Sequence, residues 1–139
     1  MPAEIHNEKS RKKCQIFTPS QIALHMLDLV GYTHELRGKC VLENSCGDGA
    51  FLVPIVERYI SESLEQGVLK ADICEGLQQD IWAYEIDKSL STCCIERLNS
   101  IAEQYGIPAV KWNVICADFL KAKIGQKFDF IVGNPPYIA

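Results

Sequence analysis

Four short apolar segments recur along the chain, and stretches with helical spacing separate most of them. Each segment is rich in β-branched, aromatic or other apolar residues, as buried strands are. The segments are residues 40–45, 81–87, 110–116 and 128–133. This alternation predicts an α/β fold with a mostly parallel, doubly wound sheet. Ligands of such sheets bind beyond the carboxyl ends of the strands, so the residues that follow each segment are the first candidates for a site.

The first apolar segment runs directly into a turn that contains two glycines. Residues 41–52 read Val-Leu-Glu-Asn-Ser-Cys-Gly-Asp-Gly-Ala-Phe-Leu, which predicts a strand, a tight turn and the start of a helix that continues to residue 65. Gly47 and Gly49 permit positive φ and close approach of a ligand to the backbone. Leu52 stands where a dinucleotide-binding loop carries its third glycine, so the pattern disfavours NAD or FAD. A turn that binds no ligand is the alternative.

A well-defined helix start precedes this loop. Thr18 suits the N-cap and Pro19 the first helical position, and such a start can bind an anion through its free N–H groups. Plain capping without a ligand is the alternative. The spacing of the apolar residues that follow predicts a helix with these residues on one face: Ile22, Met26, Leu29 and Val30.

Acidic residues end the second segment. A carboxylate at this place can accept two hydrogen bonds from the vicinal diol of a ribose, and Glu85 stands there, 42 positions after Glu43. The usual spacing is roughly 20 positions, and residues 66–80, a connector with no predicted role, account for the difference. The alternative is that Asp87 caps the next helix and Glu85 has no part in binding.

Two further motifs follow the third and fourth segments. Asp118 and Phe119 suit the amino group and the ring of an adenine, although the motif taken alone favours ordinary turn chemistry. Residues 134–137 read Asn-Pro-Pro-Tyr, in which the prolines fix φ and remove N–H donors. The side chain of Asn134 and the backbone therefore offer hydrogen-bond acceptors beside the flat ring of Tyr137. This arrangement suits an amino group on a planar heterocycle.

Composition narrows the class of protein. With 139 residues, 47% of them apolar and 23% charged, the chain fits one globular domain, and a net charge of −4 gives no general attraction to nucleic acid. Residues 1–13 are expected to be a flexible basic tail, either solvated or in contact with phosphate.

Seven cysteines without a Cys-x-x-Cys pair or a secretory signal predict reduced thiols, no metal site and a cytoplasmic protein. No apolar run is long enough to span a membrane.

The ordered motifs resemble those of the S-adenosylmethionine-dependent adenine-specific DNA methyltransferases of restriction-modification systems. The resemblance covers residues 15–137 and implies a Rossmann-like class I methyltransferase domain. It assigns to the cofactor Thr18, Pro19, Glu43, Ser45, Cys46, Gly47, Gly49, Glu85, Ile86, Asp118 and Phe119. It assigns to catalysis Asn134, Pro135, Pro136 and Tyr137.

The resemblance implies methyl transfer from S-adenosylmethionine to the exocyclic amino group of adenine in DNA. Asn134 and the Pro135 carbonyl would accept the hydrogens of the amine, while Tyr137 would stack on the flipped base. Residues 14–139 are then expected to be a partial methyltransferase domain that stops after its fourth strand and lacks the target-recognition part. We expect this piece alone to be inactive, and the whole enzyme to bind DNA and to work with a restriction endonuclease. A protein glutamine methyltransferase and a non-catalytic nucleotide-binding module are the alternatives.

Overall fold

A four-stranded parallel sheet forms the centre of the protein. The computed structural model describes residues 20–123 and 125–133. Within them lie β1 (Val41–Glu43), β2 (Ile81–Tyr84), β3 (Asn113–Ile115) and β4 (Phe130–Val132), in the spatial order β3-β2-β1-β4. Every strand lies inside one of the four apolar segments, and all three pairings are parallel. The predicted α/β fold with a parallel sheet is confirmed, whereas the basic tail of residues 1–13 lies outside the described residues.

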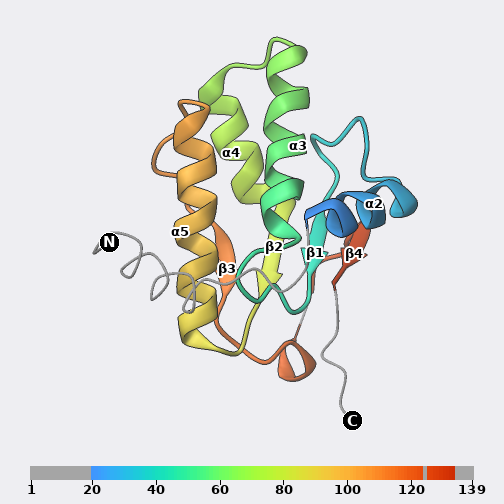
Figure 1. The fold of residues 1–139 in the computed structure, drawn as a ribbon, viewed down its shortest axis with the longest axis vertical. Coiled ribbons are helices and arrows are strands. Elements are labelled where there is room, and N and C mark those ends of the chain that lie inside the picture. Colours follow the sequence, from blue (N-terminus) through green and yellow to red (C-terminus); the bar gives the residue numbers. More distant parts are fainter. Residues whose placement is uncertain (1–19, 124, 134–139) are drawn as a thin grey trace, which may run out of the picture.

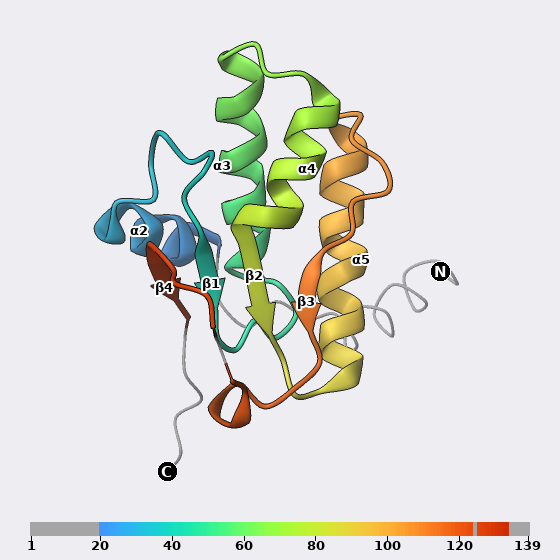
Figure 2. The ribbon, with the colours of Figure 1, turned by 180° about the vertical axis from the view of Figure 1, so that it is seen from behind.

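The helices lie mainly on one face of this sheet. They are α2 (Ser20–Val30), α3 (Leu52–Glu65), α4 (Lys70–Asp80), α5 (Lys88–Gln104) and the 3₁₀ turn η1 (Phe119–Lys121). Helices α3 and α5 cover the same face of the sheet, α4 lies beyond the amino end of β2, and α3 contacts both of the others (Figures 1 and 2). The chain passes from β1 to β2 and from β2 to β3 in the same direction across the sheet. Right-handed crossovers in one direction place their helices on one face of a sheet. The core between sheet and helices is consequently continuous.

Helix α4 occupies most of residues 66–80, the connector to which the sequence pattern assigned neither a structure nor a role. Ile73 and Leu77, one helical turn apart, are both fully buried, and they give the helix an apolar contact with the core. Gly76 lets it approach α3 closely, because a Cβ at this position would collide with the hydroxyl of Tyr59. That hydroxyl donates to Asp80 at the end of α4 (2.5 Å). The insertion is therefore a packed structural element.

Helix α2 confirms the predicted helix, but its buried residues differ from the predicted apolar face. Ala23 and Leu27 are fully buried, whereas Ile22, Leu29 and Val30 are 51%, 72% and 47% exposed. The helix contacts α3, and Met26 is the one residue of the predicted face that is half-buried. Thr18 and Pro19, the predicted start of this helix, lie outside the described residues.

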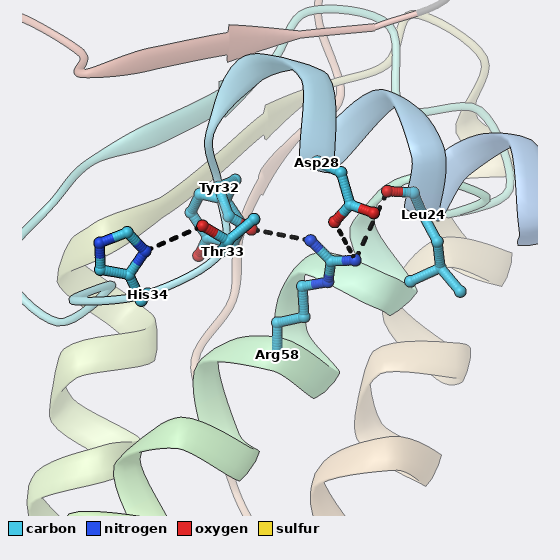
Figure 3. A network of polar contacts seen from close by, with 6 residues as sticks. All are labelled: Leu24, Asp28, Tyr32, Thr33, His34 and Arg58. Carbon is cyan, nitrogen blue, oxygen red and sulfur yellow. Dashed lines mark hydrogen bonds and ion pairs between the residues drawn. The ribbon is translucent and has the colours of Figure 1, made fainter.

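A single arginine of α3 fixes the end of α2 (Figure 3). The Arg58 guanidinium forms an ion pair with Asp28 (2.7 Å) and donates to the Tyr32 carbonyl (3.0 Å) and the Leu24 carbonyl (3.4 Å). Leu24 and Asp28 lie one turn apart on the same side of α2, and Tyr32 follows the end of the helix, so one guanidinium holds the last turns of α2 and the segment after it. Arg58 thus sets the position of α2 relative to the core.

The thiols depart from the prediction in one place. Cys93 is disulfide-bonded, so the prediction of reduced thiols is wrong for this residue. Five cysteines of the described part are free: Cys40, Cys46, Cys74, Cys94 and Cys116. In the same part of the chain, no group of three or more His, Cys, Asp or Glu side chains is placed to hold a metal ion. None of the described helices combines the length and the apolar character needed to cross a membrane.

Candidate cofactor site

The candidate site lies where the strand order reverses. The chain moves outward from β1 to β2 and β3, and then returns to place β4 on the other side of β1. Glu43 at the end of β1 is in register with Ala83 and with Val132, so the carboxyl ends of three strands are level. The residues that follow these strands therefore meet at one edge. Such a reversal point is where open α/β sheets bind their ligands.

The glycine-containing loop after β1 has the predicted tight geometry. Gly47 and Gly49 have φ of +54° and +97°, values that side chains other than glycine rarely adopt. The N–H of Cys46 donates to the Tyr84 carbonyl (2.9 Å), which ties the loop to the end of β2. A Cβ at Gly49 would lie 3.3 Å from the Cys94 sulfur of α5. The loop is thus held against both β2 and α5.

Glu85 binds this loop through its side chain. Its Oε1 accepts the N–H of Gly47 (2.9 Å) and its Oε2 accepts the N–H of Asp87 (2.8 Å), while the residue is only 7% exposed. Asp87 separately caps α5 by accepting the N–H of Leu90 (3.1 Å). Helix capping by Asp87 therefore coexists with a buried Glu85 at the edge of the site. Each oxygen of Glu85 keeps one lone-pair direction for a further donor, such as a ribose hydroxyl.

Asp118 and Phe119 form the opposite side of the site. The Asp118 carboxylate accepts the N–H of Leu120 (3.0 Å) and so caps the 3₁₀ turn η1. The Phe119 ring lies edge-on to the Tyr84 ring, with 5.6 Å between the ring centres. The turn chemistry is observed, and the turn itself carries the two side chains to the candidate cavity at the sheet edge.

A cavity of about 260 Å³ opens between these elements. It is lined by Asn44, Ser45, Glu85, Ile86, Ala117, Asp118, Phe119 and Leu120. Ile86 and Leu120 are 68% and 90% exposed, so two apolar side chains stand free at its rim. Exposed apolar side chains together with the carboxylates of Glu85 and Asp118 in one cavity suit a ligand with a flat ring and a diol.

Five of the predicted cofactor residues line this cavity, and four of the described ones do not: Glu43, Cys46, Gly47 and Gly49. The lining set is Ser45, Glu85, Ile86, Asp118 and Phe119. Cys46 is buried in the core against Cys94, and Gly47 and Gly49 belong to the loop that Glu85 holds through the Gly47 N–H. The predicted catalytic residues follow β4 and lie outside the described residues: Asn134, Pro135, Pro136 and Tyr137.

Sequence reasoning missed three residues that line the cavity. They are Asn44, Ala117 and Leu120, each next to a predicted residue in the chain. The turns after β1 and β3 present consecutive residues to the same cavity, so the neighbours of each motif were the available signal. Sequence reasoning also did not single out Asp48, which does not line the cavity. Asp48 is buried within the loop, and its carboxylate lies 4.0 Å from the guanidinium of Arg97 on α5.

Glu43 is a buried carboxyl group behind the loop. It is 1% exposed, and its Oε1 accepts the N–H of Ser45 (3.0 Å). Among the described residues its Oε2 has no hydrogen-bond partner. Burial raises the pKa of Glu43 to about 8; the Ser45 N–H opposes this shift and the charge of Glu85 adds to it. The group therefore holds its proton in the folded protein at neutral pH.

Stability should fall with rising pH because of this carboxyl group. The folded-state pKa of Glu43 lies above the unfolded value of 4.5, so the folded state binds more protons than the unfolded state does. The free energy of unfolding therefore decreases as pH rises from about 4.5 to about 8. The slope from one group is at most about 1.4 kcal/mol per pH unit. We expect Glu43→Gln to flatten this decline in urea unfolding measured at pH 5, 6.5 and 8. An unchanged slope in the variant would contradict the assignment.

The whole chain matches one family model. The model described as N-6 DNA Methylase covers residues 3–139. Among curated proteins, the type II methyltransferase M.XhoI of Xanthomonas vasicola is 36% identical, over 88% of this chain and 24% of that protein. Modification methylase CviBIII of Paramecium bursaria Chlorella virus NC1A is 31% identical, over 94% of this chain and 28% of that protein. The chain thus spans about a quarter of the length of the curated relatives it matches.

Solved structures share the fold. A modification subunit assigned to a type I restriction enzyme from Vibrio vulnificus YJ016 has a TM-score of 0.61 at 22% identity, covering 96% of this chain and 27% of that one. A Listeria monocytogenes protein assigned to the class I S-adenosylmethionine-dependent methyltransferases has a TM-score of 0.54 at 14% identity, covering 88% of this chain and 32% of that one. The four-stranded sheet is therefore part of a class I methyltransferase fold.

Proposed function

The chain belongs to the N-6 DNA methylase family, and we propose that it is the cofactor-binding part of a DNA adenine methyltransferase. The observation that carries the proposal is the cavity at the strand-order reversal, where Glu85 and Asp118 face a common space between exposed apolar side chains. Bound S-adenosylmethionine would supply an electrophilic methyl group. The acceptor would be the exocyclic amino group of adenine in DNA.

The residues present fit S-adenosylmethionine by their chemistry. Glu85 would accept the ribose hydroxyls while it continues to hold the loop at Gly47. Asp118 would accept from the adenine amino group, with Ile86 and Phe119 against the ring. Near the methionine part we assign Thr18 and Pro19 together with the loop residues Glu43, Ser45, Cys46, Gly47 and Gly49.

The acceptor side is assigned to the residues that follow β4. The lone pair of an aromatic amine is delocalised into its ring, which makes the amine a weak nucleophile. Asn134 and the Pro135 carbonyl would accept its two hydrogens and localise the lone pair on nitrogen. Pro136 would keep the backbone direction fixed, and Tyr137 would stack on the flipped base.

We assign residues 14–139 to a partial methyltransferase domain, with the target-recognition part elsewhere in the whole protein. The relatives are about four times longer than this chain, which supports the assignment. Several are type II methyltransferases, so we further propose a cytoplasmic restriction-modification enzyme that acts with an endonuclease. On its own this chain should bind cofactor and methylate DNA slowly or not at all.

Calorimetry on the 139-residue chain tests the proposal. We expect heat of binding with S-adenosylmethionine and none with NAD, because the loop carries Leu52 where a dinucleotide loop carries glycine. The full-length protein should transfer a labelled methyl group to adenine in duplex DNA. Labelling of a protein glutamine would favour the glutamine methyltransferase, and silence with both ligands would favour the nucleotide-binding module.

A further inference from the structure

Asp48 is a buried acidic residue of the glycine-containing loop that pairs with α5 and does not line the cavity. It is 1% exposed, and its Oδ2 lies 4.0 Å from Nη1 of Arg97. Among the described residues this oxygen has no hydrogen-bond partner. Burial raises the pKa of Asp48, and the charge of Arg97 is the strongest influence that opposes this shift. Arg97 therefore stabilises the charged form of the buried carboxyl group.

The loop contacts α5 at two points that lie one helical turn apart. Cys46 is buried against Cys94, and Asp48 lies beside Arg97. Residues three positions apart on a helix share one side of it, so one side of α5 receives two side chains of the loop. Helix α5 is thus the support against which the loop is placed.

Two glycines make anchors of this kind necessary. Gly47 and Gly49 flank Asp48 with φ of +54° and +97°, and glycine loses more conformational freedom on folding than any other residue. Glu85 anchors one flank of the loop by accepting the Gly47 N–H (2.9 Å). The pairing of Asp48 with Arg97 is a second anchor, which attaches the loop to α5.

Stability alone is a weak reason for an acidic residue at this position. A buried carboxylate oxygen without a hydrogen bond is destabilising, and neutral residues often replace buried ion pairs without loss of stability. The pair does lie directly beside the cavity, because Ser45, which lines it, stands three positions before Asp48 in the same loop. An effect on ligand binding explains the charge better than an effect on folding does.

We propose that Asp48 and Arg97 are positioning residues that hold the loop in the conformation that binds the cofactor. The inference rests on the proposed function of the same site. Neither residue lines the cavity, so the pair acts through the loop and raises the fraction of molecules that are ready to bind. The apparent affinity falls in proportion to that fraction when the pair is broken.

Calorimetric titration of the 139-residue chain tests the pair. We expect Asp48→Asn and Arg97→Gln each to raise the Kd for S-adenosylmethionine by about 5- to 20-fold. The double variant should cost at most about twofold more than the larger single effect, because both changes remove one interaction. Arg97→Lys keeps the charge and should stay within about threefold of the wild type. In the full-length enzyme, the KM for the cofactor should rise while kcat changes by less than about twofold.

A second ligand separates anchoring of the loop from direct attraction of the cofactor. S-adenosylhomocysteine, the product of methyl transfer, lacks the positive charge at sulfur. If Asp48 anchors the loop, Asp48→Asn should weaken binding of both ligands by the same factor. A loss confined to S-adenosylmethionine would show that the carboxylate acts on the sulfonium charge, and would overturn the proposal.

Two controls keep the test specific. Glu96→Gln removes a negative charge from an exposed neighbour of Arg97 on α5 and should leave the Kd unchanged. Thermal unfolding of each variant identifies a temperature at which it is fully folded, and the side chain of Arg97, at 22% exposed, can be changed without opening the core. An unchanged Kd in Arg97→Gln, or strictly additive losses, would overturn the proposal. Absence of cofactor binding in the wild-type chain would instead refute the proposed function.

Discussion

Asn134→Ala in the full-length enzyme should reduce adenine methylation by about a hundred- to a thousandfold, the usual loss when one preorganised polar group at a reaction centre is removed. The amide oxygen is assigned the role of accepting a hydrogen from the target amine. Without it the lone pair stays delocalised into the ring, and the amine stays a weak nucleophile. Single-turnover transfer of a labelled methyl group from S-adenosylmethionine to duplex DNA measures the rate.

The same variant should bind cofactor normally. In the 139-residue chain we expect the Kd for S-adenosylmethionine to change by less than about twofold, because Asn134 is assigned to the acceptor. Asn99→Ala is a matched control. Asn99 lies on α5, outside the lining of the cavity, and its amide oxygen accepts a hydrogen bond from the Trp112 indole (2.7 Å). Its methylation rate should be close to that of the wild type. Full activity of Asn134→Ala would show that the catalytic assignment is wrong.

Glu85→Ala should weaken binding of S-adenosylmethionine by about 30- to 100-fold, since hydrogen bonds to a charged group contribute about 1.5–3 kcal/mol. Two losses combine in this variant. The ribose hydroxyls lose their proposed acceptor, and the loop loses the bond from the Gly47 N–H to the carboxylate (2.9 Å). Calorimetric titration of the 139-residue chain measures the change in Kd.

Glu62→Ala is a matched control for this experiment. The Glu62 carboxylate also accepts two backbone N–H groups, those of Glu35 and Leu36, each at 2.7 Å. Both variants therefore lose a carboxylate that anchors a loop, and both should lose about 1–3 kcal/mol in the free energy of unfolding. Only Glu85→Ala should lose cofactor affinity as well. Equal losses of affinity in the two variants would mean that Glu85 acts through stability alone.

Local patterns predicted the elements of the sheet with good accuracy. Each observed strand lies within a predicted segment, and the loop at Gly47 and Gly49 has the predicted positive φ values. Helix α5 begins at Lys88, directly after Asp87, the residue that the sequence offered as a helix cap. These features depend on residues close together in the chain, such as a cap, a glycine or an apolar run, and they are visible in sequence for that reason.

Patterns that depend on distant partners were less successful. Helix α4 was not predicted because its stabilising contacts, Ile73 and Leu77 in the core and Gly76 against Tyr59, come from another element. The buried face of α2 was misplaced for the same reason, because α3 decides which of its apolar residues are covered. The local sequence of α2 does not show that Ile22 and Leu29 are exposed.

The sequence by itself determined the family, the parallel α/β architecture and the motifs that follow the strands, since all of these are written in short runs of neighbouring residues. Only the tertiary structure decided which of those residues share a cavity. The register between β1, β2 and β4 brings Asn44, Glu85 and Gly133 to one edge from positions far apart in the chain. The tertiary structure also buries Glu43, which raises the pKa of this residue, and it places oxygens of Asn44 and Glu43 where a Cβ of residue 133 would lie. Burial and close approach arise from the packing of separate elements, and no local pattern encodes them.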